Sequence, residues 1–484
     1  MALKFGTSGL RGFVTEMTDK ECYISTTAFL MYLLETNNIQ RESLVAIAGD
    51  RRPSTNKIMS AVATAITDFG CQVSNCGKIP TPAVSFFGFQ KHIPSIMITG
   101  SHIPFDMNGI KFNMPFGEVL KTDEPRIIEL KEKLSVENNF TKKFDLNDEL
   151  LSVDELPKIN EEAAQLYLER YTNFLPKNCL GDKKIVFYGH SSVGRELLPQ
   201  IFEKLGAEVI KVNYTENFTP IDTEAIREED LELAANWVKE YSPDVIFSTD
   251  GDTDRPMLFD EKGHFIRGDV LCIFSALYLK ANSVSVPISS STALEELGKF
   301  KDIRRTKIGS PYVIAGMNEA LKNGLSRVVS YEANGGFLTA DEIEIDGRNF
   351  QPLPTRDAVF PLIGALLLAD MRGLTLSELA ISMPRRIVYS SSIKGVPTEN
   401  SKAFIVKLSK MTDFSEVTEM FQFPAQIKKV DFTDGARMYL ENGEIVHLRP
   451  SGNAPELRCY SEAISEECAK WLTDQTLRLA KEKI

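Results

Sequence analysis

Short runs of β-branched and aliphatic residues recur along the chain in sets of three, and longer segments with helical periodicity separate them. This alternation is typical of sheets whose parallel strands are connected by helices. The predicted strands are 44–50, 70–77 and 95–102, then 184–190, 206–213 and 244–254, then 283–291, 300–309 and 327–336. Because the spacing differs between the sets, the pattern predicts three α/β domains with a shared topology and not a strict repeat.

The last hundred residues follow a different pattern. Apolar and polar residues alternate over 431–463 around the tetrapeptide ENGE, whose Asn-Gly pair is a strong hairpin signal, and a helix is predicted over 468–483. A smaller α+β domain is therefore expected from about Arg386 onward. Since 484 residues exceed what one hydrophobic core supports, the length suggests about three or four domains, and the predicted elements divide into four. Their predicted ranges are 1–155, 156–259, 260–385 and 386–484.

The composition of the chain argues against nucleic-acid and membrane partners. The formal net charge of −12 argues against a nucleic-acid partner, which requires a basic face. No apolar run reaches the roughly 18 residues of a membrane helix, and the amino terminus lacks the apolar segment of a signal peptide. The seven cysteines are scattered without a CxxC pair, as in a protein with reduced thiols. We expect a cytoplasmic protein that does not bind membranes.

The segment STDGDTDRP contains the densest group of candidate metal ligands. Asp250, Asp252 and Asp254 follow a predicted buried strand at alternate positions, so extended geometry would place their carboxylates on one side. Three carboxylates at this spacing suit Mg²⁺. A calcium-binding EF-hand loop would use Glu261 at its twelfth position, but its sixth position is Arg255 where that loop requires glycine. An acidic turn in solvent is the remaining alternative.

Two later loops suit recognition of a phosphorylated sugar. In RPSGNAPELR, Arg449 and Arg458 flank a turn with a hydroxyl and free amides, a pattern suited to a phosphate dianion. In YEANGG, Glu332 and Asn334 offer a carboxylate and an amide to sugar hydroxyls. Surface turns with solvated side chains would look similar in both cases.

Further cations stand beside glycine-containing turns. Arg11 lies in FGTSGLRG, and Lys307 lies in TKIGSPY. Either residue could contribute to an anion site or be a solvated surface charge.

The segment TGSHIPFDMNGIKF, residues 99–112, leaves the role of Ser101 open. Its neighbour His102 suggests a hydrolase, but a serine nucleophile needs a base and an orienting acid, and the G-x-S-x-G elbow is missing. With a metal site and a phosphate clamp elsewhere in the chain, Ser101 is better interpreted as a phosphoryl carrier. A phosphoserine there would be an anionic ligand completing the aspartate site.

Five ordered motifs together resemble the α-D-phosphohexomutases, most closely the bacterial phosphomannomutases and phosphoglucomutases. The motifs are FGTSGLRG, TGSHIPFDMNGIKF, DGDTDRP, YEANGG and RPSGNAPELR. The resemblance covers nearly the whole chain and implies four domains around a central cleft, three of them with a shared α/β topology. It also implies that Ser101 is the phosphoserine and that Mg²⁺ is held by its phosphate and the three aspartates.

The resemblance implies roles for the remaining residues as well. Glu332 and Asn334 would contact sugar hydroxyls, and the non-reacting phosphate would be held by Arg449, Ser451, Gly452, Asn453 and Arg458. Arg255 and Lys111 would neutralise charge on the transferred phosphoryl group, and Arg11 is also predicted to belong to the catalytic set. The general base is left open between Lys307 and His102.

The predicted activity is interconversion of mannose 1-phosphate and mannose 6-phosphate for sugar-nucleotide synthesis, with a glucose or mannose 1,6-bisphosphate as activator. Phosphoglucomutase or dual activity is the main alternative, and phosphoglucosamine mutase a lesser one. Departures from the family pattern at Gly100 and Ile103 leave the Ser-His pair intact, whereas those at Asn334 and Gly336 bear on the sugar. A phosphatase with an aspartate nucleophile and a non-catalytic phosphosugar-binding protein are rival classes. The chain is expected to act as a monomer or dimer.

Overall fold

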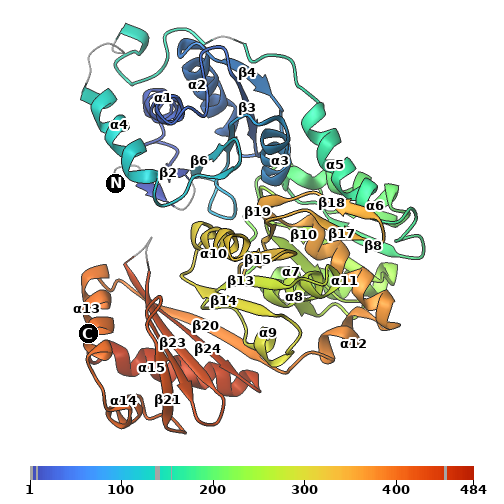
Figure 1. The fold of residues 1–484 in the computed structure, drawn as a ribbon, viewed down its shortest axis with the longest axis vertical. Coiled ribbons are helices and arrows are strands. Elements are labelled where there is room, and N and C mark those ends of the chain that lie inside the picture. Colours follow the sequence, from blue (N-terminus) through green and yellow to red (C-terminus); the bar gives the residue numbers. More distant parts are fainter. Residues whose placement is uncertain (1–3, 7–8, 137–141, 154, 452–454) are drawn as a thin grey trace.

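The computed structural model describes residues 4–6, 9–136, 142–153, 155–451 and 455–484. Figure 1 shows four successive parts of the chain, with the first (blue) and the last (red) at opposite ends and the two middle parts between them. No helix among the described residues is long and apolar enough to cross a lipid bilayer.

The first three parts each contain a sheet built on the same plan. In every case the first strand of a predicted set lies in the middle, parallel to the second strand on one side and to the third on the other. A fourth strand then pairs antiparallel with the third. The predicted shared topology is confirmed, and all nine predicted strands are present.

The first sheet has the order β1-β2-β6-β5-β3-β4, with β7 paired to β6. Its strands are β1 (Lys4–Gly6), β2 (Gly9–Phe13), β3 (Leu44–Gly49), β4 (Gln72–Asn75), β5 (Ser95–Ile98), β6 (Met107–Met114) and β7 (Gly117–Glu118). The accompanying helices are α1 (Asp19–Glu35), α2 (Thr55–Asp68), α3 (Thr81–Lys91) and α4 (Glu124–Val136).

The second sheet has the order β12-β11-β10-β8-β9. Its strands are β8 (Lys184–Tyr188), β9 (Glu208–Val212), β10 (Val245–Thr249), β11 (Pro256–Phe259) and β12 (Phe265–Ile266). The helices of this part are α5 (Glu162–Phe174), the short 3₁₀ helix η2 (Val193–Arg195), α6 (Leu197–Lys204) and α7 (Glu228–Tyr241).

The third sheet has the order β14-β13-β15-β16-β19, and β17 and β18 form a separate hairpin. The strands are β13 (Ser283–Pro287), β14 (Asp302–Thr306), β15 (Val328–Tyr331), β16 (Phe337–Thr339), β17 (Ile343–Ile345), β18 (Arg348–Phe350) and β19 (Leu353–Asp357). The helices are α8 (Gly268–Tyr278), α9 (Ala293–Glu296), α10 (Ser310–Lys322), α11 (Val359–Arg372) and α12 (Leu376–Ile381).

The fourth part is an antiparallel sheet, β20-β24-β23-β22-β21, with three helices among its described residues. The predicted hairpin around ENGE is confirmed, because β22 and β23 pair across it. The bounds are β20 (Ile387–Lys394), α13 (Thr398–Ser409), α14 (Phe414–Phe421), β21 (Ile427–Asp431), β22 (Ala436–Leu440), β23 (Ile445–Pro450), β24 (Glu456–Ala463) and α15 (Glu466–Lys481).

The buried apolar residues of the fourth part form a cluster separate from those of the other three. One apolar cluster runs through α3, α5, α6, α8 and α11, so it joins the first three parts, whereas the fourth part has its own cluster. Polar contacts connect the two: Glu462 Oε1 accepts hydrogen bonds from Ser291 Oγ (3.1 Å) and Thr292 N (2.8 Å) and pairs with Arg386 Nε (3.1 Å). The fourth domain is therefore attached mainly by directional bonds and not by a continuous core.

Candidate active site

The aspartate triplet follows β10 and is buried. Asp250, Asp252 and Asp254 are at most 1% exposed, and each places a carboxylate oxygen within 4.8 Å of the others. The extended geometry expected for this segment is wrong, because the chain turns here: Thr253 has φ 64°, and Asp250 Oδ1 accepts hydrogen bonds from the backbone N of Asp254 and Arg255. The turn, and not strand alternation, brings the three carboxylates together.

The donor set fits a divalent cation. Asp252 Oδ1 and Asp254 Oδ1 are buried and have no hydrogen-bond partner among the described residues, which is costly for a carboxylate unless another charge satisfies it. Oxygen-only ligation of this kind suits Mg²⁺. The calcium-loop alternative does not fit, because the Glu261 carboxylate is bound by Ser377 Oγ at 2.5 Å.

Ser101 lies against this cluster although 149 residues separate it from Asp250 in sequence. Its Oγ donates to Asp250 Oδ2 at 2.5 Å, and the residue is 1% exposed. The loop after β5 therefore meets the loop after β10, as expected for carboxyl ends of strands that face one site. The predicted juxtaposition of Ser101 with the three aspartates is present in the structure.

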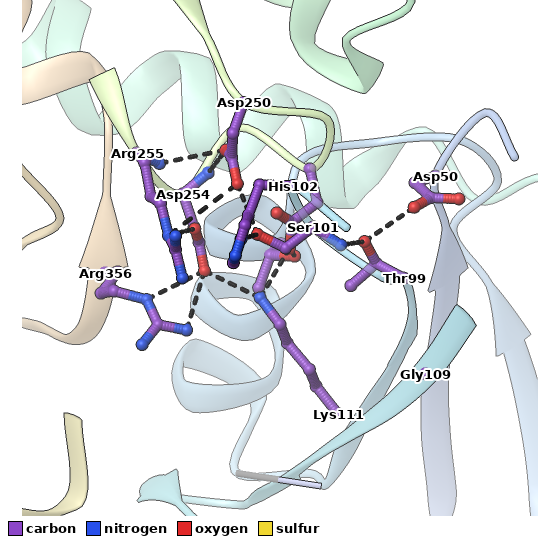
Figure 2. Close-up of polar contacts among 12 residues, drawn as sticks. Asp50, Thr99, Ser101, His102, Gly109, Lys111, Asp250, Asp254, Arg255 and Arg356 are labelled. Atoms are coloured by element: carbon purple, nitrogen blue, oxygen red, sulfur yellow. Dashed lines mark hydrogen bonds and ion pairs between the residues drawn. The ribbon is translucent and has the colours of Figure 1, made fainter. Parts of the chain in front are cut away.

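Cationic side chains surround the aspartates (Figure 2). Lys111 Nζ, on β6, lies 2.6 Å from Asp252 Oδ2 and 2.7 Å from Asp254 Oδ2. Arg356 Nη2 lies 2.9 Å from Asp254 Oδ2, and Arg255 Nε lies 3.6 Å from Asp254 Oδ1. The site thus holds several positive charges beside the buried carboxylates.

The pKa values of Asp250 and Asp254 are shifted in opposite directions. Burial, reinforced by the negative charges of Asp252 and Asp254, raises the pKa of Asp250 well above its usual value. Burial acts in the same direction on Asp254, but the charges of Arg356, Lys111 and Arg255 outweigh it and lower the pKa of Asp254. Asp254 is thus held as a carboxylate by its cations, whereas the negative charges around Asp250 disfavour its ionised form.

His102 is held as a neutral imidazole. The positive charge of Arg255 and burial lower its pKa to about 2. Its Nδ1 lies 3.3 Å from Ser101 Oγ, and Figure 2 shows the ring between the serine and Arg255. The lowered pKa means that the imidazole is a weak base in this environment.

The candidate sugar loop reaches the same cluster. Glu332 and Asn334 are each 6% exposed, and Glu332 Oε2 accepts from Arg356 Nη1 at 2.9 Å. Asn334 Oδ1 accepts from the backbone N of Gly336, which shapes the turn. Because Arg356 also contacts Asp254, it connects the sugar loop with the aspartate cluster.

The candidate phosphate loop places two arginines opposite each other. Arg449 on β23 and Arg458 on β24 are directly paired residues of adjacent strands. Each has a carboxylate partner, Asp434 for Arg449 (2.9 Å) and Glu456 for Arg458 (3.3 Å), and two guanidinium groups on neighbouring strands suit a phosphate dianion. Ser451 is buried beside them, whereas the predicted ligands Gly452 and Asn453 lie outside the described residues.

The predicted catalytic residues Arg11 and Lys307 differ in their surroundings. Burial and the positive charge of Arg255 lower the pKa of Arg11 on β2 to about 10, so Arg11 lies within electrostatic range of Arg255. Lys307 is exposed, and its Nζ lies 5.9 Å from the Tyr312 ring centre. No contact within the described part of the chain joins Lys307 to Ser101 or the aspartates.

Family comparison agrees with this geometry. Four family models for the phosphoglucomutase/phosphomannomutase domains match the chain: α/β/α domain I over residues 2–136, domain II over 165–263, domain III over 267–387 and the C-terminal domain over 403–479. The chain belongs to the phosphoglucomutase/phosphomannomutase family.

Individual relatives of this family match over nearly the full length. A phosphomannomutase of Salmonella muenchen is 40% identical over 483 residues, covering 100% of this chain and 96% of the relative. A phosphomannomutase of Sinorhizobium fredii is 39% identical, covering 99% and 98%. A solved structure of a phosphoglucomutase/phosphomannomutase family protein from Burkholderia thailandensis superposes with a TM-score of 0.75 at 19% identity, covering 99% of this chain and 97% of that one. The four-domain fold of the phosphohexomutases is confirmed.

Sequence reasoning missed two polar residues of this phosphohexomutase site. Arg356 lies near the end of β19, a strand that the sequence pattern did not predict, and no motif surrounds it. Asp434 pairs with Arg449 Nε at 2.9 Å and also accepts from the backbone N of Ile308 at 3.0 Å. It therefore ties the phosphate-loop arginine to the third domain, and nothing in its sequence context indicates that role.

Replacing Asp434 with asparagine is expected to raise KM for the sugar phosphate about tenfold, with a smaller effect on kcat. The amide side chain would keep the shape but lose the charge that orients Arg449. Steady-state kinetics measures the split. The matched control is Asp413→Asn, which alters an exposed carboxylate that caps α14 in the same domain. A variant with unchanged KM would show that Arg449 is positioned without Asp434.

Proposed function

We propose that the protein interconverts mannose 1-phosphate and mannose 6-phosphate through a phosphorylated Ser101 and a mannose 1,6-bisphosphate intermediate. Membership of the family makes it a phosphohexomutase, an isomerase that moves a phosphoryl group within a sugar phosphate. The observation that carries the proposal is the hydrogen bond from Ser101 Oγ to Asp250 inside the buried aspartate cluster.

The transfer step is a displacement at phosphorus. A sugar hydroxyl oxygen forms a bond to phosphorus while the bond from phosphorus to Ser101 Oγ breaks, and the hydroxyl proton passes to a base. His102 lies next to Ser101, but its lowered pKa makes it a weak base. Lys307 is exposed and has no contact with Ser101 among the described residues, so both residues stay candidates for the base. Lys111, Arg255 and Arg11 stabilise charge on the phosphoryl oxygens.

Asp250, Asp252, Asp254 and the phosphate on Ser101 would hold Mg²⁺, which supplies additional positive charge at the transferred group. The bisphosphate must then turn, so that its other phosphate returns to Ser101. The paired arginines Arg449 and Arg458, with Ser451, Gly452 and Asn453, would hold whichever phosphate is not reacting. Glu332 and Asn334 would bind sugar hydroxyls.

Mannose is the proposed sugar because two relatives at 40% and 39% identity over nearly the full chain are phosphomannomutases. Glucose phosphates are the main alternative, since the family description names both activities. A glucose or mannose 1,6-bisphosphate is proposed as the activator that loads Ser101.

The proposed domain ranges are 1–155, 156–259, 260–385 and 386–484. The family matches support this division, because each match falls largely within one of the successive ranges.

The proposed location is the cytoplasm. All seven cysteines are free thiols, which supports it.

A coupled assay with mannose 1-phosphate, glucose 1-phosphate and glucosamine 1-phosphate tests the substrate. We expect the highest kcat/KM with mannose 1-phosphate, and turnover that requires Mg²⁺ and a hexose 1,6-bisphosphate. A higher kcat/KM with another sugar phosphate would contradict mannose as the preferred sugar, but the proposal that the protein is a mutase would stand. Absence of turnover with all three would refute the proposed reaction.

A further inference from the structure

The side chain of Arg52 lies directly behind the loop that carries Ser101. Its guanidinium is fully buried and donates four hydrogen bonds to backbone carbonyls of that loop. Nη2 reaches the carbonyls of Ser101 (2.9 Å) and Ile103 (2.6 Å), and Nη1 reaches those of Pro104 (2.5 Å) and Met107 (3.0 Å). One side chain therefore binds four points of a seven-residue loop.

A carboxylate completes this arrangement. Arg52 Nε pairs with Asp50 Oδ2 at 3.2 Å, and both side chains are 0% exposed. Asp50 Oδ2 also accepts from Thr99 Oγ1 at 2.7 Å, and Thr99 Oγ1 accepts from the backbone N of Ser101 at 2.8 Å. The network therefore holds Ser101 from both sides, through its amide and through its carbonyl. A buried ion pair whose remaining donors and acceptors are all occupied favours one fixed arrangement.

Gly100 makes room for the guanidinium. A Cβ on this residue would lie 2.6 Å from Arg52 Cζ and 2.7 Å from its Nε, closer than carbon and nitrogen atoms can approach. Gly100 is not among the glycines with positive φ, so the requirement is for space and not for backbone freedom. The ring centre of Phe218, from the second domain, lies 4.0 Å from Arg52 Cζ, which is a cation–π contact.

The loop needs such support because Ser101 has φ 55°, in the left-handed region that a serine adopts only at an energetic cost. That conformation directs Oγ to Asp250. If the loop relaxed, the oxygen that carries the phosphoryl group would leave its position at the aspartate cluster.

We propose that Arg52, accommodated by Gly100, is a positioning residue that fixes Ser101 for phosphoryl transfer. The inference rests on the proposed function for its catalytic consequence. Arg52 acts on the loop backbone and touches neither the candidate sugar loop nor the paired phosphate arginines within the described structure. Its loss should therefore lower kcat and leave KM nearly unchanged.

Three variants and one control test this role. We expect Arg52→Gln to lower kcat about 100-fold and Arg52→Lys about tenfold, because lysine keeps the charge but binds fewer carbonyls. Gly100→Ala should lower kcat at least about tenfold by displacing the guanidinium while Arg52 itself is still present. KM should stay within about threefold in all three. The control is Arg51→Gln, since Arg51 is the sequence neighbour and pairs with the exposed Glu216.

Amide hydrogen exchange of residues 101–107 gives a readout independent of activity. The three variants should exchange faster than the wild type in this loop, and Arg51→Gln should not. If the loop exchanges faster but the wild type shows no mutase turnover, the proposed function fails and the positioning role stands. Wild-type kcat in Arg52→Lys and Gly100→Ala, or a change confined to KM, would overturn the proposal. If Arg52→Gln does not fold, Gly100→Ala and Arg52→Lys decide the question.

Discussion

Replacing Ser101 with alanine is expected to lower mutase turnover at least about 1,000-fold, the largest single effect in this protein. Ser101 Oγ is the atom that the buried cluster positions, with Asp250 at 2.5 Å and His102 at 3.3 Å. Alanine has no oxygen to carry the phosphoryl group. The measurement is kcat in the coupled assay under saturating sugar phosphate and bisphosphate.

Intact mass of the purified chain supplies the second measurement for this variant. After incubation with a hexose 1,6-bisphosphate, the wild type should gain the mass of one phosphoryl group and Ser101→Ala should not. Ser135→Ala, which alters an exposed serine at the end of α4, is the matched control and should behave as the wild type. Substantial activity in Ser101→Ala would indicate an aspartate nucleophile and the phosphatase class.

Local patterns in the sequence predicted the strand sets well because each strand is a short buried run flanked by turn residues. The same reasoning placed Ser101, Asp250 and Glu332 near one another, since each follows the third strand of its set and such strand ends face the ligand site of an α/β sheet. The hairpin before β23 was predicted for an equally local reason, its Asn-Gly turn. Each of these features depends on a few adjacent residues.

The residues that escaped prediction act across long sequence separations. Arg52 binds carbonyls about fifty residues away, and Arg356 binds an aspartate 102 residues away. Neither has a local signature, because their partners are backbone carbonyls or side chains of another domain. The turn at Thr253 was missed for a related reason: the residues of STDGDTD permit both an extended and a turned chain, and the packing of Ser101 against Gly251 belongs to the assembled domains.

Replacing Lys111 with methionine is expected to have opposite effects on metal binding and on catalysis. In the structure the Lys111 ammonium bridges Asp252 Oδ2 and Asp254 Oδ2 at 2.6 and 2.7 Å, so it competes with a cation for the same oxygens. Methionine removes that competing charge while retaining an unbranched chain of similar length. Mg²⁺ should then bind the unphosphorylated protein about tenfold more tightly, because three buried carboxylates lose a compensating cation.

Turnover of Lys111→Met should nevertheless fall about 100-fold, because the ammonium is one of the groups that stabilise charge on the transferred phosphoryl oxygens. Calorimetric titration with Mg²⁺ measures the first effect, and the coupled assay at saturating Mg²⁺ measures the second. Lys121→Met is the control, since Lys121 pairs with Glu124 away from the aspartates. Weaker Mg²⁺ binding together with unchanged kcat would mean that Lys111 organises the aspartates and takes no part in phosphoryl transfer.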